Sequence, residues 1–124
     1  MLYCVANARY PVEYISSGNL ISEDGFLHDR RNLDSWVFIV VQKGTLHIAQ
    51  NEQTFDVHEN ETLLLFPNQT HYGYKKCEGY LSYYWVHFYM TDPHYTIYSR
   101  KTLLRHGHFL YDTFTPPRKY SVNS

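Results

Sequence analysis

The sequence has little net charge and lacks the basic clusters with which a protein grips DNA by itself. Its 11 Lys and Arg residues stand against 12 Asp and Glu residues, which gives a formal net charge of −1. A DNA-binding surface needs many cations to neutralise phosphates. The densest basic clusters here are the isolated pairs Arg30-Arg31, Lys75-Lys76 and Arg100-Lys101. We therefore expect no direct binding of this chain to DNA.

Long apolar runs and paired cysteines are also lacking. No stretch approaches the ~20 apolar residues of a membrane span, and the segment after Met1 has no apolar run of signal-peptide length. Cys4 and Cys77 lie far apart and have no metal-type spacing. We expect both to be reduced thiols in a cytoplasmic protein that has no contact with a membrane.

Motifs of nucleophilic and phosphate chemistry are missing too. The sequence has no G-x-S-x-G elbow and no glycine-rich phosphate loop, and neither cysteine sits in an activating motif. We predict no catalytic residue.

Aromatic residues and short apolar runs are what the sequence does have, with 13 Tyr, 7 Phe and 2 Trp. The runs are separated by turn residues, at a spacing typical of an all-β sandwich or barrel. Predicted strands cover residues 36–44, 45–49, 61–67 and 80–90, and another begins at residues 54–57, while residues 71–76 form an aromatic and basic segment.

The ends of the chain are less regular. Residues 2–15 predict an extended arm and a first strand interrupted by Pro11, and Ser17-Gly18-Asn19 predicts a turn. Gln50 to Gln53 predicts another turn. A short helix over residues 95–104 is an alternative that β-branched residues weaken.

Three segments in order resemble one family. They are GNLISEDGFLHDRRNLDSWVFIVVQKGTLHI (residues 18–48), ETLLLFPNQTHYGY (61–74) and YYWVHF (83–88). Together they resemble the regulatory cupin domain of AraC-type transcription regulators. The resemblance implies an all-β fold, a cupin-type jelly-roll β-barrel of two antiparallel sheets with a ligand between them.

The same resemblance implies a domain plan. Residues 1–17 would form an N-terminal arm and first strand, residues 18–110 the barrel, and residues 111–124 a loose tail. A helix-turn-helix domain would follow in the full-length protein, and nothing after Asp92 supplies its two helices. DNA would be contacted only through that domain, and the full-length protein could form a homodimer.

Catalytic cupins hold a metal with two His residues and a Glu in the first motif and a further His in the second. Here the first motif reads His28-Asp29-Arg30, so an Arg replaces the second His, and only Asp34 lies near the place of the Glu. The second motif keeps His71. Because an Arg repels a cation and too few ligands remain, we expect no metal and no other cofactor.

Strand alternation and the resemblance together indicate a ligand site. Leu81, Tyr83, Trp85, His87 and Tyr89 share one face of their strand. In the resembling regulators the Trp faces the ligand, which puts Tyr83 and Trp85 in the barrel. Core packing is the alternative role for Trp85.

The turns of the resembling regulators supply further candidates. His71 and Tyr72 match the turn that borders the pocket, and Arg30 or Arg31 matches an Arg that hydrogen-bonds the ligand. Alternation cannot decide between the two, because the loop from Asn32 breaks the register. An N-terminal arm over residues 3–10 would close over the ligand.

The resulting prediction is an effector-binding regulatory domain of a bacterial AraC-type transcription factor, without enzymatic activity. It would sense a small polar molecule, with a sugar as the first candidate. The alternatives are a small cupin enzyme, such as a sugar isomerase, and a stand-alone carbohydrate-binding module.

Overall fold

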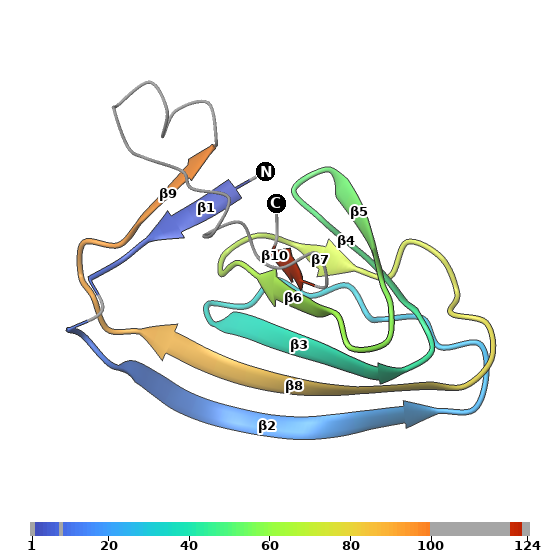
Figure 1. The fold of residues 1–124 in the computed structure, drawn as a ribbon. Coiled ribbons are helices and arrows are strands. Elements are labelled where there is room, and N and C mark those ends of the chain that lie inside the picture. The colour runs from blue at the N-terminus through green and yellow to red at the C-terminus, as the bar shows by residue number, and fades with distance from the viewer. Residues whose placement is uncertain (1, 8, 100–119, 123–124) are drawn as a thin grey trace.

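The computed structural model describes residues 2–7, 9–99 and 120–122, and this part of the chain is built from strands without a helix (Figure 1). The strands are β1 (Leu2–Val5), β2 (Val12–Ser22), β3 (Trp36–Lys43), β4 (Leu46–Gln50), β5 (Gln53–Val57), β6 (Thr62–Leu65), β7 (His71–Tyr72), β8 (Leu81–Met90), β9 (Thr96–Ser99) and β10 (Tyr120–Val122). The predicted all-β class is confirmed.

Two sheets form the body of the domain. The larger has the order β10-β6-β3-β8-β2, and the smaller has the order β5-β4-β7. All neighbours within them pair antiparallel except β10, which runs parallel to β6. Figure 1 shows β4, β5 and β7 lying over the curved larger sheet, while β1 and β9 form a separate ribbon at one end.

The apolar core lies between the two sheets. Every second residue of β3 is buried, as are the facing residues of β4, because successive strand residues point to opposite sides. The most deeply buried members of this core are Ile39, Val41, Leu46, Ile48, Val57, Leu63, Leu65 and Leu81. Their burial explains why the apolar runs of the sequence were sufficient to predict the strands.

The predicted turn at Ser17-Gly18-Asn19 is wrong, because all three residues lie inside β2. Gly18 pairs with Trp85 of β8, and a Cβ atom added to Gly18 would lie 2.5 Å from Cζ2 of the indole. The glycine gives the ring room to lie across the neighbouring strand, which is a role that glycine often has within sheets.

The second predicted turn is shorter than expected. Gln50 ends β4 and Gln53 begins β5, so the hairpin loop consists of Asn51 and Glu52. Both loop residues have positive φ angles, of 56° and 60°. This is the conformation of a two-residue hairpin turn with the twist of the flanking strands.

At the N-terminal end, β1 and β2 lie on either side of Pro11, in agreement with the expected extended segment, whereas the alternative of a short helix near the other end is wrong where the structure describes it. β1 pairs with β9, so residues 96–99 are a strand and not the start of a helix, while residues 100–104 lie outside the described part. The proposed barrel boundary at residue 18 falls within β2. Of the expected tail, residues 120–122 form β10 and residues 111–119 are outside the described part.

Candidate ligand-binding pocket

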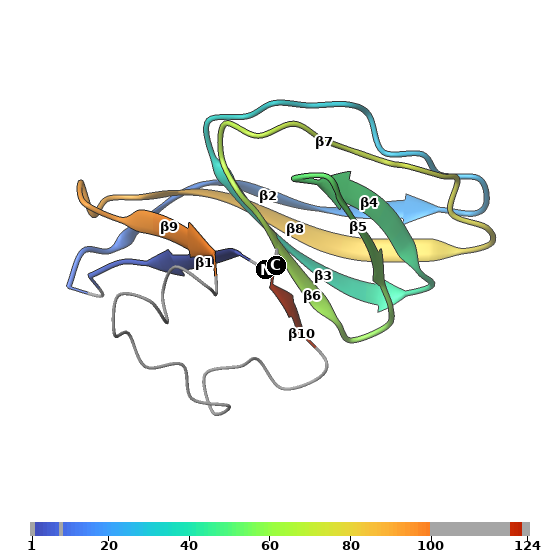
Figure 2. The same ribbon diagram turned by 90° about the horizontal axis from the view of Figure 1, so that it is seen from above.

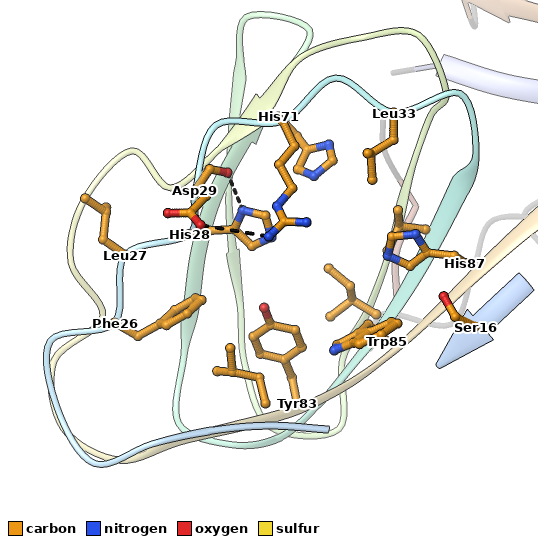
Figure 3. A pocket seen from close by; sticks show the side chains of 14 residues that line it. Ser16, Phe26, Leu27, His28, Asp29, Leu33, His71, Tyr83, Trp85 and His87 are labelled. Carbon is orange, nitrogen blue, oxygen red and sulfur yellow. Dashed lines mark hydrogen bonds and ion pairs between the residues drawn. The ribbon is translucent and has the colours of Figure 1, made fainter. Parts of the chain in front are cut away.

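A cavity of about 470 Å³ lies between the two sheets (Figure 3). This is within the usual size range of small-molecule sites. The lining residues are Ser16, Leu20, Phe26, Leu27, His28, Asp29, Arg31, Leu33, Val37, Ile39, His71, Tyr83, Trp85 and His87. Seven of these residues are apolar and seven have polar or ionisable side chains, so the wall of the cavity is mixed.

β8 supplies one side of the cavity. Tyr83, Trp85 and His87 alternate along this strand and all line the pocket, with the Tyr83 hydroxyl directed into it (Figure 3). The His87 ring packs edge-on against Trp85 at 5.0 Å between centroids. On β2, Leu20 pairs opposite Tyr83 and completes this side.

The opposite side comes from the β2–β3 connection, which runs beside the segment containing β7 (Figure 2). Arg31 and His71 exchange two backbone hydrogen bonds, each of 2.9 Å between nitrogen and oxygen. Directly paired residues project to the same side of a sheet, so Arg31 follows His71 into the cavity. Arg30 projects to the other side, where its guanidinium lies 4.1 Å from the ring centroid of Tyr72.

A buried glutamine fixes the loop that carries His71. The side chain of Gln50 is fully enclosed, and its Nε2 donates to the backbone oxygens of Phe66 and Gln69, both at 3.0 Å. Its Oε1 accepts from the Phe66 amide at 2.9 Å. These bonds satisfy backbone groups that no strand partner reaches and so hold the β6–β7 loop in place.

The polar groups of the cavity are mutually repulsive when protonated. Burial lowers the pKa of His71 to about 4, with His28, Arg31 and His87 acting in the same direction. Burial also lowers the pKa of His28 and of His87, and Arg31 adds to both effects. Burial raises the pKa of Tyr83. At neutral pH the cavity therefore presents neutral imidazoles and a phenol beside a permanently charged guanidinium.

Although three histidines line the cavity, they do not fit the metal of catalytic cupins. The Nδ1 atom of His28 lies 2.6 Å from the carbonyl oxygen of Asp29 and must donate to it, because a carbonyl only accepts. Within the described ranges, no group of three or more His, Cys, Asp or Glu side chains is arranged to hold an ion. Convergence of such ligands is what a catalytic metal needs.

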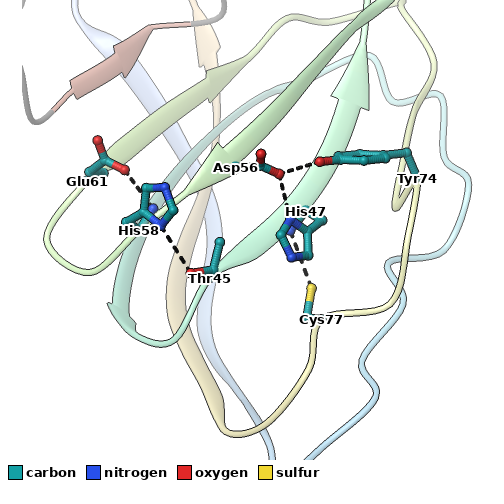
Figure 4. A network of polar contacts seen from close by, with 7 residues as sticks. All are labelled: Thr45, His47, Asp56, His58, Glu61, Tyr74 and Cys77. Atoms are coloured by element: carbon teal, nitrogen blue, oxygen red, sulfur yellow. Dashed lines mark hydrogen bonds and ion pairs between the residues drawn. The ribbon is translucent and has the colours of Figure 1, made fainter.

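A cysteine, a histidine and an aspartate also meet on the smaller sheet, outside the cavity (Figure 4). His47 Nδ1 lies 2.6 Å from Asp56, which also accepts from the Tyr74 hydroxyl. Only the backbone amide of His47 reaches Cys77, at 3.3 Å from the sulfur. Burial raises the pKa of the Cys77 thiol, which disfavours its thiolate form. Both cysteines are free, as predicted.

The structure brings four of the six predicted site residues to one cavity: Arg31, His71, Tyr83 and Trp85. Arg30 and Tyr72 contact each other away from it. Sequence reasoning did not include His87 among the site residues, although alternation already put it on the face of Tyr83 and Trp85. Phe26 and Leu20 carried no signal of their own in the sequence.

Residues 20–96 match the family described as AraC-like ligand binding domain. The chain belongs to this family. It is also 39% identical over 79 residues to YisR, an uncharacterized HTH-type transcriptional regulator of Bacillus subtilis. That match covers 64% of this chain and 27% of the relative, so the chain spans about a quarter of the length of the curated relative it matches.

Solved structures of cupins share the fold of this AraC-like domain. A cupin superfamily protein from Desulfitobacterium hafniense superposes with a TM-score of 0.54 at 12% identity, covering 72% of this chain and 78% of that protein. A candidate mannose-6-phosphate isomerase from Ralstonia eutropha has a TM-score of 0.54 at 10% identity, covering 72% and 83%. At these identities the likeness shows the fold alone, and it confirms the predicted cupin barrel. No helix in the described residues is long and apolar enough to cross a membrane.

Proposed function

We propose that this domain is the effector-binding part of an AraC-type transcription factor and that the cavity between its sheets is the effector site. The observation that supports the proposal best is the pocket itself: the chain belongs to a ligand-binding family, and four of the six predicted site residues line this cavity. The effector is a small polar molecule, with a sugar as the first candidate. The protein would work in the cytoplasm.

The cavity suits a compact ligand with one apolar face. The Trp85 indole and the Phe26 ring offer flat apolar surfaces, and the Tyr83 hydroxyl offers a polar contact between them. A sugar would use both features, because its ring can stack on an aromatic face while a hydroxyl at the edge of the ring contacts the Tyr83 hydroxyl.

DNA would be contacted through another domain of the full-length protein, since this domain has a net charge of −1. Effector binding regulates transcription only if the ligand has different affinities for two states of that protein. A homodimer is the usual way to present two DNA-binding domains to paired half-sites.

The enzyme alternative has one supporting observation, the fold shared with the candidate isomerase. Membership of a ligand-binding family favours a sensor. The same family membership also argues against a stand-alone carbohydrate-binding module.

Two neighbouring tyrosines provide the test. Tyr83 lines the pocket and is 3% exposed, whereas Tyr84 lies on the outer face of the same strand and is 46% exposed. A panel of sugars is screened by protein thermal shift, and hits are titrated against wild type, Tyr83→Phe and Tyr84→Phe. Loss of the Tyr83 hydroxyl should weaken a hit by about 1–3 kcal/mol.

The Tyr84 variant should bind like wild type. Binding that responds equally to both substitutions would place the effector outside the cavity and contradict the proposal. A sugar that is converted to product, rather than only bound, would favour the enzyme.

A further inference from the structure

The cavity holds more basic side chains than a neutral ligand requires. Arg31, His28, His71 and His87 line it, against one lining carboxylate, Asp29. The Asp29 side chain is 83% exposed and lies 3.8 Å from the Arg31 guanidinium, at the solvent side of the cavity. Such a carboxylate is largely screened by water, while the histidines behind it are not.

The basic groups converge from separate elements. His28 comes from the β2–β3 connection, His71 from β7 and His87 from β8, and the His28 and His71 rings lie 5.2 Å apart between centroids. Arg31 is close enough to act electrostatically on all three. The alternation of side chains along a single strand would not bring these basic groups together. Their convergence depends on the pairing of Arg31 with His71.

Two of the rings have a nitrogen with unused hydrogen-bonding capacity. Because His28 Nδ1 donates to the Asp29 carbonyl, its Nε2 carries the lone pair in the neutral ring and becomes a second donor on protonation. The His71 residue is only 3% exposed, and its Nδ1 has no hydrogen-bond partner among the described residues. Buried polar atoms of this kind are uncommon and call for an explanation.

We infer that the ligand of this pocket carries a carboxylate or phosphate group bound by Arg31, His28 and His71. Its apolar body then lies against Trp85, so that a sugar acid or a sugar phosphate fits the cavity better than a neutral sugar. The inference rests on the proposed function, since it takes the cavity to be the effector site. An anion is attracted by Arg31 and would stabilise the protonated forms of the histidines, whereas a neutral hydroxyl provides no such charge compensation.

Binding should then be coupled to proton uptake. The groups facing the anion are His28, Asp29 and Arg31 from the β2–β3 connection, His71 from β7, and Tyr83 and His87 from β8. Tyr83 stays a neutral donor, because burial raises its pKa. The Oγ atom of Ser35 lies 3.4 Å from Nδ1 of His87. An anion raises the lowered pKa of each histidine, so the complex holds more protons and affinity rises as the pH falls.

The experiment follows the histidine ring signals of the labelled domain by NMR. Acetate and inorganic phosphate serve as probes of the anion group, with chloride at equal ionic strength as the reference. We expect saturable shifts of the His28 and His71 rings, with acetate binding at least about threefold tighter at pH 5.5 than at pH 7.5; the phosphate titration is read at pH 7.5, because phosphate itself takes up a proton over this range. Comparison of the affinities for acetate and phosphate distinguishes a carboxylate site from a phosphate site.

The neighbouring arginines give a matched pair of variants. Arg31→Gln removes the guanidinium at the cavity and should weaken the tighter anion about tenfold or more. Arg30→Gln removes the same charge from the side facing Tyr72 and should leave the affinity within about twofold. Equal effects of the two variants, or no ring shift with either anion, would overturn the inference.

A second titration with D-glucose and D-glucuronate separates this inference from the proposed function. If D-glucose shifts the pocket signals as strongly as D-glucuronate, the cavity binds sugars but the anion inference is wrong. If neither sugar nor either anion reaches the cavity, both are wrong. Stronger binding of D-glucuronate that is lost in Arg31→Gln supports both.

Discussion

Mild acid should destabilise this domain through His71. The residue is 3% exposed, and burial with its positive neighbours lowers its pKa from 6.5 to about 4. A histidine whose pKa is lower in the folded than in the unfolded protein binds protons preferentially in the unfolded state. The free energy of unfolding should therefore be constant above about pH 6.5 and fall as the pH drops from there towards 4.

The size of the effect follows from the two pKa values. Their difference, 6.5 − 4, is 2.5 pH units, and at about 1.4 kcal/mol per unit the loss over the whole window is about 3 kcal/mol. The lowered pKa values of His28 and His87 act in the same direction. A loss of this size is a large fraction of the stability of an ordinary domain.

Urea unfolding at a series of pH values between about 4.5 and 7.5 measures this loss of stability. His71→Gln should reduce the slope of the free energy of unfolding against pH by the contribution of nearly one bound proton, because the titrating group is gone. Ile48→Val, a fully buried substitution in the core, should lower the whole profile by about 0.5–1.5 kcal/mol without changing its slope. A His71→Gln profile with the wild-type slope would refute the assignment of the acid loss to this residue.

Three further predictions concern packing and metal content. Gly18→Ala should displace the Trp85 indole, change its fluorescence emission and cost about 1–3 kcal/mol in urea unfolding, whereas Ser17→Ala on the same strand should do neither. Gln50→Leu should cost at least about 2 kcal/mol, because it leaves the Phe66 amide buried without an acceptor; a midpoint equal to wild type would contradict the role of this side chain. Elemental analysis of the domain after purification without chelators should find well below one Zn, Fe, Mn or Ni per chain, and a retained stoichiometric ion would restore the metalloenzyme alternative.

The strands could be predicted because their signal is local. The run from Trp36 and the run from Tyr80 are β-branched and aromatic, and burial of one face follows from alternation. The same alternation was enough to put Tyr83 and Trp85 on one face. His87 was available from this pattern as well and was missed because its role depends on what faces it.

The choice between Arg30 and Arg31 could not be made from the sequence. It is decided by the pairing of Arg31 with His71, a contact between segments that are remote along the chain. Gly18 was misread for a related reason. A glycine within polar residues indicates a turn locally, and only the indole on the neighbouring strand shows why it belongs in β2.

The hold of Gln50 on the β6–β7 loop has a mechanical consequence for the cavity. Its three hydrogen bonds make the loop before His71 stiff, since any displacement from β4 must break them. The β2–β3 connection lies beside this loop and is tied to it, because Arg31 and His71 exchange two backbone hydrogen bonds and the Asn68 amide donates to the Leu33 carbonyl oxygen at 2.6 Å. The backbone around the cavity should therefore resist deformation, and an incoming molecule should be accommodated first by movement of the Asp29 and Arg31 side chains, which are 83% and 53% exposed.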